Sequence, residues 1–198
     1  MPPPAGALMP APRLLPAATR LAQPWKNGGG TTSTVAQWPE GAAIDAVGWR
    51  LSLAEVTEAG PFSSFAGIDR QLAMLAGAME LRFGDETMRL DPASPALGFA
   101  GEAPVVGVPL GGPARDLNLM MARARFAGRL ERVAGPVVLR ARPGCHQLLL
   151  VLAPAPTTAP ASPGLPALAP LDALWLAPGE GGEWVVPAAG WLATITAR

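Results

Sequence analysis

Short runs of alternating or β-branched residues, separated by glycine and proline, form the main pattern along the chain. Apolar runs of this length that end at turn residues are typical of strands in a β-sandwich or β-barrel. Eleven such runs predict strands, and they cover residues 31–38, 49–56, 70–77, 79–84, 87–91, 105–110, 115–121, 137–141, 146–153, 183–187 and 191–198. The pattern therefore predicts an all-β fold.

Proline and glycine interrupt the whole sequence, with 24 and 23 residues among 198. Long helices are excluded by this spacing, because proline removes a helical hydrogen bond and clashes with the preceding turn. A helix is predicted only locally, over Met120–Glu131. Residues 83–87 and 178–184 are predicted to be hairpin connections. The Ala/Pro-rich stretch 153–170 is predicted to be a solvated loop of low complexity.

Alternation within the runs decides which polar side chains share a face, because strand side chains have a period of two. Arg50, Ser52 and Ala54 lie on one side of their predicted strand, and Asp116 and Asn118 share one side of another. Either these residues form ordinary polar outer faces over an apolar core, or they converge on a polar site. The pattern alone leaves both interpretations open.

Residues 68–74 depart from a simple division into polar and apolar faces. Asp69 and Gln71 share one side of this predicted strand, whereas Arg70 shares the other side with Leu72 and Met74. Arg70 is therefore the unusual residue of the run.

The segment from Trp25 to Gly30 places Lys26 and Asn27 directly before three glycines. A phosphate-binding P-loop is improbable, because its lysine follows the glycines and a helix opens behind it, whereas residues 31–35 favour a strand. Two interpretations remain. The amides of the three glycines form a concave nest for a small anion, assisted by Lys26 and Asn27, or the segment is a tight turn with a solvated Lys26.

Charge and composition limit the partners of the chain. Fifteen Lys and Arg residues balance fifteen Asp and Glu residues, so we expect no nucleic-acid partner and no membrane partner. The longest apolar run, Leu148–Ala155, is far below the roughly 18 residues that span a bilayer. The tryptophans lie mostly where basic residues are scarce, so packing explains them better than base stacking. Trp25, next to Lys26, is the exception and is expected to form a pocket wall.

The chain contains one cysteine and one histidine. Cys145 has no partner for an intramolecular disulfide, which fits a reducing cytosol and predicts a cytoplasmic protein. His146 alone cannot build a histidine-rich metal site, so we expect no metal and no cofactor. His146 is predicted to be a hydrogen-bonded strand residue and Cys145 a buried small hydrophobe.

Five ordered segments resemble the HutD/Ves family. They are PWKNGGGTT (24–32), WRLSLAEV (49–56), GPFSSFAGIDRQLAMLAG (60–77), GFAGEAPV (98–105) and GPARDLNLM (112–120). The resemblance implies a bicupin, in which two small antiparallel β-barrels of jelly-roll type pack in one chain. We accordingly expect a mobile N-terminal extension over residues 1–12, an N-terminal barrel with the pocket over 13–112, and a C-terminal barrel over 113–198.

The resemblance also implies a function. HutD proteins are associated with histidine utilisation, where they limit expression of the pathway by binding a metabolite such as urocanate or formylglutamate. The Ves branch is instead linked to environmental stress. Membership of the combined family therefore leaves two physiological roles open.

The family motifs, placed on this chain, predict a ligand site in its first half. The predicted ligand-binding residues are Trp25, Lys26, Asn27, Gly28, Gly29, Gly30, Arg50, Ser52, Glu55, Ser63, Asp69, Arg70, Asp116 and Asn118. One departure is clear: relatives commonly continue the glycine run with Thr-Arg-Glu-Ile, whereas this chain reads Thr32, Ser33, Thr34, Val35. A contact made by that arginine and glutamate is lost here.

Three functional hypotheses follow. The leading one is a metal-independent protein that binds a small carboxylate metabolite: Arg50 offers paired planar donors, Lys26 a second charge, and Asn27, Ser52 and Ser63 neutral hydrogen bonds. The second is an enzyme of isomerase or lyase type that uses a carboxylate and Lys26 as acid and base, with no assigned catalytic residue. The third is an interaction module whose partner is a regulator or a second copy of the chain, as in a homodimer.

Overall fold

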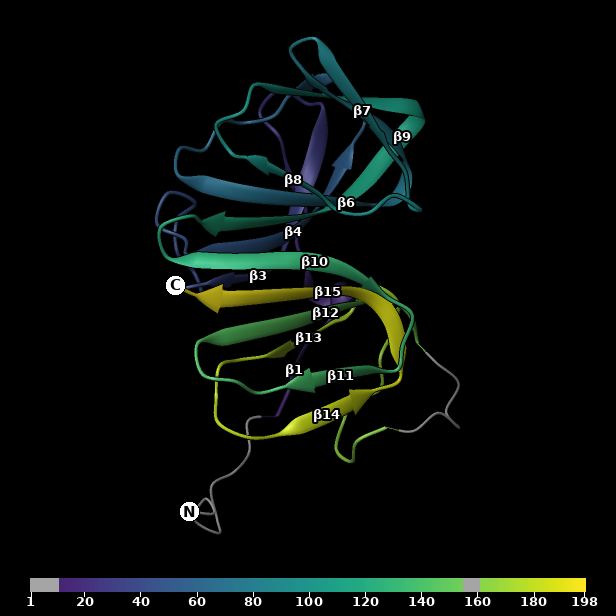
Figure 1. Ribbon diagram of the computed structural model, residues 1–198. Coiled ribbons are helices and arrows are strands. Elements are labelled where there is room, and N and C mark those ends of the chain that lie inside the picture. Colours follow the sequence, from purple (N-terminus) through teal and green to yellow (C-terminus); the bar gives the residue numbers. More distant parts are fainter. Residues whose placement is uncertain (1–10, 155–160) are drawn as a thin grey trace. The chain divides into compact units, whose positions relative to one another are not determined.

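The computed structural model describes residues 11–154 and 161–198. Their regular structure consists of antiparallel sheets and one three-residue 3-10 helix, η1 (Ala17–Thr19), which confirms the all-β part of the predicted fold class (Figure 1). Among these residues, no helix has the length and apolar character needed to cross a membrane. Residues 1–10 of the predicted extension and residues 155–160 of the predicted loop lie outside the described part.

Contacts divide the chain into two compact units, each with its own hydrophobic core. The larger unit comprises Ala18–Glu131 with Arg198. The smaller unit comprises the described residues up to Ala17 together with Arg132–Ala197. The boundary predicted between residues 112 and 113 falls inside a strand, so the larger unit extends beyond the expected N-terminal barrel.

The larger unit is built on one sheet with the strand order β2-β3-β4-β9-β6-β7, to which β5 adds on β9 and β8 adds on β6. This order is open rather than circular, so the closed barrels implied by the resemblance stay a prediction. The strands are β2 (Gln23–Pro24), β3 (Gly30–Trp38), β4 (Trp49–Val56), β5 (Gly60–Pro61), β6 (Ile68–Phe83), β7 (Glu86–Leu90), β8 (Leu97–Ala100) and β9 (Val105–Ala122).

Strands β6 and β9 form a long bent ribbon, and each contains two of the predicted runs. Glycines stand at the junctions: Gly77 in β6 has a φ of 68°, and Gly111 and Gly112 in β9 have φ values of 72° and 142°. The register between the two strands shifts at the same place. The glycines therefore bend two continuous strands instead of ending them.

The smaller unit contains an antiparallel sheet in the order β1-β13-β12-β15 and the separate pair β11-β14. Its strands are β1 (Arg13–Leu15), β11 (Val137–Arg140), β12 (Cys145–Pro154), β13 (Ala173–Leu176), β14 (Glu183–Val186) and β15 (Ala188–Ala197). The predicted hairpin over residues 178–184 is wrong, because the strands on either side of it, β13 and β14, pair in different sheets. The hairpin predicted over 83–87 is correct: Phe83 pairs with Glu86 across a two-residue turn.

The predicted helix over Met120–Glu131 is also wrong. The segment contains the end of β9, a turn, and most of strand β10 (Phe126–Val133). The Gln71 side chain binds the backbone of β10 twice, since its Oε1 accepts from the Leu130 amide at 2.6 Å and its Nε2 donates to the Gly128 carbonyl at 3.1 Å. These bonds use backbone groups two residues apart, which favours an extended strand over helical pairing.

Replacing Gln71 by leucine is expected to lower the free energy of unfolding by about 1–3 kcal/mol, because two backbone groups of β10 lose their side-chain partner. Urea denaturation measures this change. The control is Arg129→Ala on the same strand, where the arginine is 65% exposed and binds only Glu131, so a change within about 0.5 kcal/mol is expected. Equal effects of the two substitutions would contradict the role given to Gln71.

Candidate functional site

The polar residues of three adjacent strands meet on one face of the larger unit. Residues that pair directly across antiparallel strands project from the same side of a sheet. The registers of β4, β9 and β6 therefore define three successive rows on this face. The first row holds Arg50, Met120 and Arg70, the second holds Ser52, Asn118 and Leu72, and the third holds Ala54, Asp116 and Met74.

A cavity of about 680 Å³ opens over these rows. It contains nine of the fourteen predicted ligand-binding residues, namely Trp25, Lys26, Asn27, Arg50, Ser52, Ser63, Arg70, Asp116 and Asn118. Its other lining residues are Gln23, Pro24, Thr32, Ile44, Ala54, Pro61, Phe62, Phe65 and Met120. The side chains that alternation placed on shared strand faces thus line one cavity, and the expected pocket wall Trp25 is part of it.

Arg50 lies half-buried on the first row. Its Nε and Nη2 atoms both donate to the Thr34 hydroxyl oxygen, at 3.2 and 2.8 Å. Burial lowers the pKa of the guanidinium from its ordinary value. Because a hydroxyl carries no charge, this contact orients Arg50 without neutralising it.

Arg70 is buried, with 6% of its surface exposed. Its guanidinium carbon lies 4.9 Å from the Phe62 ring centre and 5.2 Å from the Phe99 ring centre. Aromatic faces stabilise a desolvated cation, which explains how Arg70 occurs among apolar neighbours. Burial lowers its pKa to about 10, although Asp116 opposes the shift. The Nε atom has no hydrogen-bond partner among the residues that the structure describes.

Asp116 and Asn118 complete the polar face, and both are buried. Burial raises the pKa of Asp116 to about 7, and the nearby charge of Arg70 only partly opposes this effect. The Oδ1 atoms of Asp116 and Asn118 accept no hydrogen bond from the described part of the chain. The site thus holds a carboxyl group that can exchange its proton near neutral pH.

The glycine segment forms a tight turn beside the cavity. The Gly28 amide donates to the Trp25 carbonyl at 3.0 Å, and the Gly29 amide donates to the Asn27 Oδ1 atom at 3.2 Å. Gly28 has a φ of 75°, which a residue with a side chain rarely adopts. A Cβ atom on Gly30 would overlap the Glu55 carbonyl oxygen.

Gly28 and Gly30 are therefore needed by the turn itself. Two of the three glycine amides donate within it, and none of the three glycines lines the cavity. This geometry favours the tight-turn interpretation over the anion nest. The turn is tied to the cavity wall by Trp25, whose Nε1 atom donates to the Thr32 hydroxyl at 2.7 Å. The exposed Lys26 and Asn27 follow directly, at the rim.

Two predicted residues, Glu55 and Asp69, point away from the cavity. Glu55 accepts a hydrogen bond from the Arg115 guanidinium at 2.9 Å and is partly exposed. Asp69 accepts one from Arg123 Nε at 2.6 Å. Glu55 follows the lining residue Ala54, and Asp69 precedes the lining residue Arg70. The two-residue period of a strand therefore places Glu55 and Asp69 on the opposite side.

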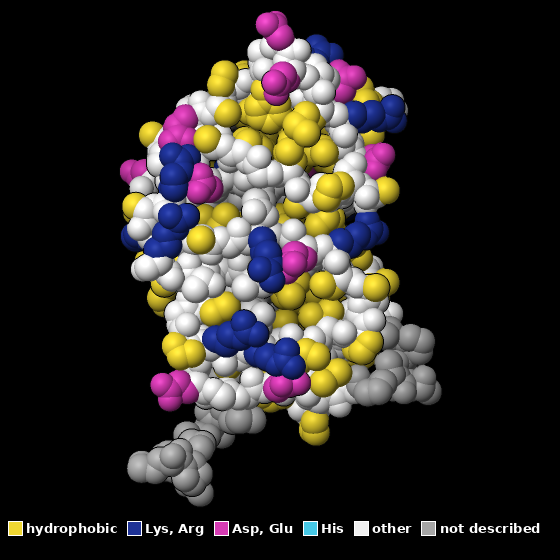
Figure 2. All heavy atoms as spheres, in the orientation of Figure 1, with side chains coloured by type: hydrophobic (Ala, Val, Ile, Leu, Met, Phe, Trp, Pro, Cys, Tyr) yellow, Lys and Arg dark blue, Asp and Glu magenta, His cyan; other side chains and the backbone are white. Residues whose placement is uncertain are grey.

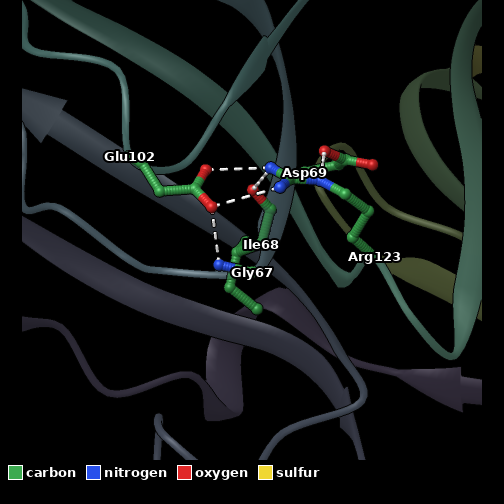
Figure 3. Close-up of polar contacts among 5 residues, drawn as sticks. All are labelled: Gly67, Ile68, Asp69, Glu102 and Arg123. Atoms are coloured by element: carbon green, nitrogen blue, oxygen red, sulfur yellow. Dashed lines mark hydrogen bonds and ion pairs between the residues drawn. The ribbon is translucent and has the colours of Figure 1, made fainter.

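Asp69 belongs to a polar cluster formed by Gly67, Ile68, Asp69, Glu102 and Arg123, which we call the Arg123 cluster (Figure 3). Arg123 donates to both carboxylate oxygens of Glu102, at 3.1 and 2.8 Å, and to the Ile68 carbonyl at 3.0 Å. The Gly67 amide also donates to Glu102, at 2.7 Å. These bonds lower the pKa of Glu102 to about 2. The cluster fixes the turn that carries the cavity residue Phe65.

Sequence reasoning missed the lining residues Gln23, Ile44 and Phe65. It also missed Thr34, the hydrogen-bond partner of Arg50. Thr34 has a signal in the sequence, because β3 alternation places it on the same side as the lining residue Thr32. Gln23, Ile44 and Phe65 lie in short strands, loops or turns, where no period predicts direction.

The single histidine lies in the smaller unit. His146 is 3% exposed and accepts a hydrogen bond at Nδ1 from Trp175 Nε1, at 3.2 Å, as a hydrogen-bonded strand residue should. Burial lowers its pKa to about 4, so the ring is neutral at pH 7. Cys145 is a buried free thiol. The described residues contain no cluster of three or more metal-ligating side chains.

On the face drawn in Figure 2, basic and acidic side chains are interspersed among apolar and neutral ones. This distribution matches the balanced composition of the chain. The cationic groups of the cavity therefore act at short range.

Comparison with known proteins gives a consistent result. A model of the HutD family matches residues 17–194. An uncharacterized 21.2 kDa protein from the hutC 3' region of Pseudomonas putida is 40% identical over 120 residues, which are 60% of this chain. The matched segment spans 63% of the length of that curated relative.

Two solved structures cover nearly the whole chain. HutD from Pseudomonas fluorescens SBW25 (formate condition) is 29% identical, with a TM-score of 0.79 over 95% of this chain and 100% of that one. A conserved protein of unknown function from Pseudomonas aeruginosa PAO1 is 33% identical, with a TM-score of 0.76 over 94% of this chain and 98% of that one.

The buried Asp116 generates a prediction about pH. Its folded-state pKa of about 7 exceeds the ordinary value of 3.8, so the stability associated with its protonated form is complete below about pH 4 and is lost as the pH rises through 7. Asp116→Asn keeps the shape without the charge. The variant should therefore exceed the wild type in free energy of unfolding at pH 8, by at most about 4 kcal/mol, and match it near pH 4.

Urea denaturation of both proteins from pH 4 to pH 8 measures this difference. Glu80→Gln serves as the control, because Glu80 binds Arg82 at the surface, outside the cavity. A difference between Asp116→Asn and wild type that does not change with pH would contradict the burial of an unpaired carboxylate.

Proposed function

The chain belongs to the HutD family, and from this premise we propose that its larger unit binds a small carboxylate metabolite, of the urocanate or formylglutamate type, in the cavity over β4, β9 and β6. The proposal includes a role in histidine utilisation. It is supported by the relative in Pseudomonas putida, a protein of the hutC 3' region. A cytoplasmic location, expected from the single cysteine, is part of the same proposal.

The observation that carries the proposal is the charge of the cavity lining. Lys26, Arg50 and Arg70 line it, against the single carboxyl group of Asp116. Both arginines have lowered pKa values because burial removes water from them. An anionic ligand would compensate these partly desolvated cations, and the guanidinium plane suits a carboxylate.

The size and walls of the cavity support the same class of ligand. Its volume of about 680 Å³ lies within the range of roughly 300–1,000 Å³ found for small-molecule sites. Trp25, Phe62 and Phe65 supply apolar wall, and Ser52 and Asn118 supply neutral polar groups. A few convergent polar groups in an otherwise apolar pocket are typical of metabolite sites.

The proposal also keeps the bicupin architecture that the family resemblance implies. The division of the chain into two β units, each with a hydrophobic core, supports that architecture. No described residue of the smaller unit belongs to the cavity lining. Ligand binding is therefore assigned to the larger unit alone.

Removing either arginine of the cavity lining, Arg50 or Arg70, should weaken carboxylate binding. Arg50→Gln and Arg70→Gln are each expected to raise the dissociation constant for urocanate or formylglutamate by about 10- to 100-fold, because each removes a charge-assisted hydrogen bond. Isothermal titration calorimetry measures the change. Arg82→Gln, which removes the same charge outside the cavity, is the control. No binding to wild type at millimolar concentration, or equal affinity in all three variants, would contradict the proposal.

Thr34 provides a second test, because its neutral hydroxyl leaves the charge of Arg50 available to a ligand. Thr34→Glu places a carboxylate against Arg50 and should weaken binding of the same acids by at least about tenfold. Thr34→Gln has the same size without the charge and should bind within about threefold of the wild type. If the two variants bind equally, Arg50 is not the anion contact.

A further inference from the structure

Three buried polar atoms of the cavity residues have no hydrogen-bond partner among residues 11–154 and 161–198. They are Nε of Arg70, Oδ1 of Asp116 and Oδ1 of Asn118. All three residues line the cavity, and at most 8% of each is exposed. Buried polar groups in native proteins are nearly always paired, so these atoms mark positions where a bound molecule supplies the partner.

The three atoms require different hydrogen-bond partners. The Arg70 Nε–H is a donor and needs an acceptor, such as a carboxylate oxygen. The Asn118 carbonyl oxygen is an acceptor, and an ionised Asp116 accepts only, so both need an N–H or O–H donor. A simple anion satisfies Arg70, but it leaves both acceptors unpaired and brings like charge towards Asp116.

The strand register fixes the order of the donor and acceptor residues across the sheet face. Arg50 and Arg70 lie on the first row, Asn118 on the second and Asp116 on the third. Successive rows are two residues apart along each strand, which is about 7 Å. The Arg70 guanidinium is near enough to Asp116 for their charges to interact. A ligand a few bonds long therefore reaches from the cationic row to the acceptor rows.

We infer that the ligand of this cavity is bifunctional: an anionic group faces Arg50 and Arg70, and an N–H or O–H donor at its other end binds Asn118 and Asp116. This inference rests on the proposed function, and it narrows the ligand class. Acids with an imidazole, amide or hydroxyl donor opposite the carboxylate belong to it. Inorganic anions and carboxylates without a donor do not.

The test uses two acids that differ in the donor alone. Urocanate carries an acrylate and an imidazole, which at pH 8 is neutral and keeps one N–H. 3-(3-Furyl)acrylate carries the same acrylate on a ring of similar size that has no N–H. Isothermal titration at pH 8 should show wild type binding urocanate at least about tenfold more tightly, because the furan leaves buried acceptors unpaired.

Two variants locate the donor site. In Asn118→Leu and Asp116→Leu, the preference for urocanate should fall to within about threefold, while furylacrylate binds at least as tightly as it does to the wild type. Retained furylacrylate binding shows that a variant is folded. If one variant does not fold, the other decides the question alone.

The outcomes separate this inference from the proposed function. Failure of both acids to bind wild type at millimolar concentration overturns the proposed function and the inference with it. Equal affinity of the two acids overturns the inference and leaves carboxylate binding intact. A urocanate preference that survives in the folded leucine variants also overturns it, because the donor then binds elsewhere.

Discussion

The burial of Arg70 and Asp116 on one face of the β4-β9-β6 sheet is the constraint on which the cavity depends. Moving a charged group out of water is costly unless a partner compensates the loss. Here the compensation is incomplete, because aromatic rings cover Arg70 and its charge only partly offsets the desolvation of Asp116. A ligand of the proposed class would complete this compensation.

The direction of the cavity side chains follows from the sequence. The run WRLSLAEV has the bounds of β4, so its period of two places Arg50 and Ser52 together. The same period, applied at every position, excludes Glu55 and Asp69 from that face. These two residues entered the predicted site through family motifs, which record that a residue recurs and not the side of the strand to which it points.

The register and the bends are not readable from the sequence in the same way. Arg50 and Arg70 both pair with Met120, and this relation depends on contacts between segments far apart in the chain. Glycines were interpreted as strand ends, yet in β6 and β9 they bend strands that continue, because the partner strand bends with them. The segment 120–131 was predicted to be helical, yet it contains the end of β9 and most of β10, because β10 is hydrogen-bonded in a sheet and the Gln71 side chain binds its backbone twice.

The Arg123 cluster has a consequence for how molecules reach the cavity. Five side-chain hydrogen bonds join Arg123 and Glu102 to each other, to Asp69 and to the backbone of residues 67 and 68, next to Phe65. These bonds hold the segment that carries Phe65 in place at several points. Two other residues of the lining, Lys26 and Ile44, are exposed and take no part in this cluster. An acid of the proposed class would therefore meet the exposed ammonium group of Lys26 before the half-buried Arg50 and the buried Arg70.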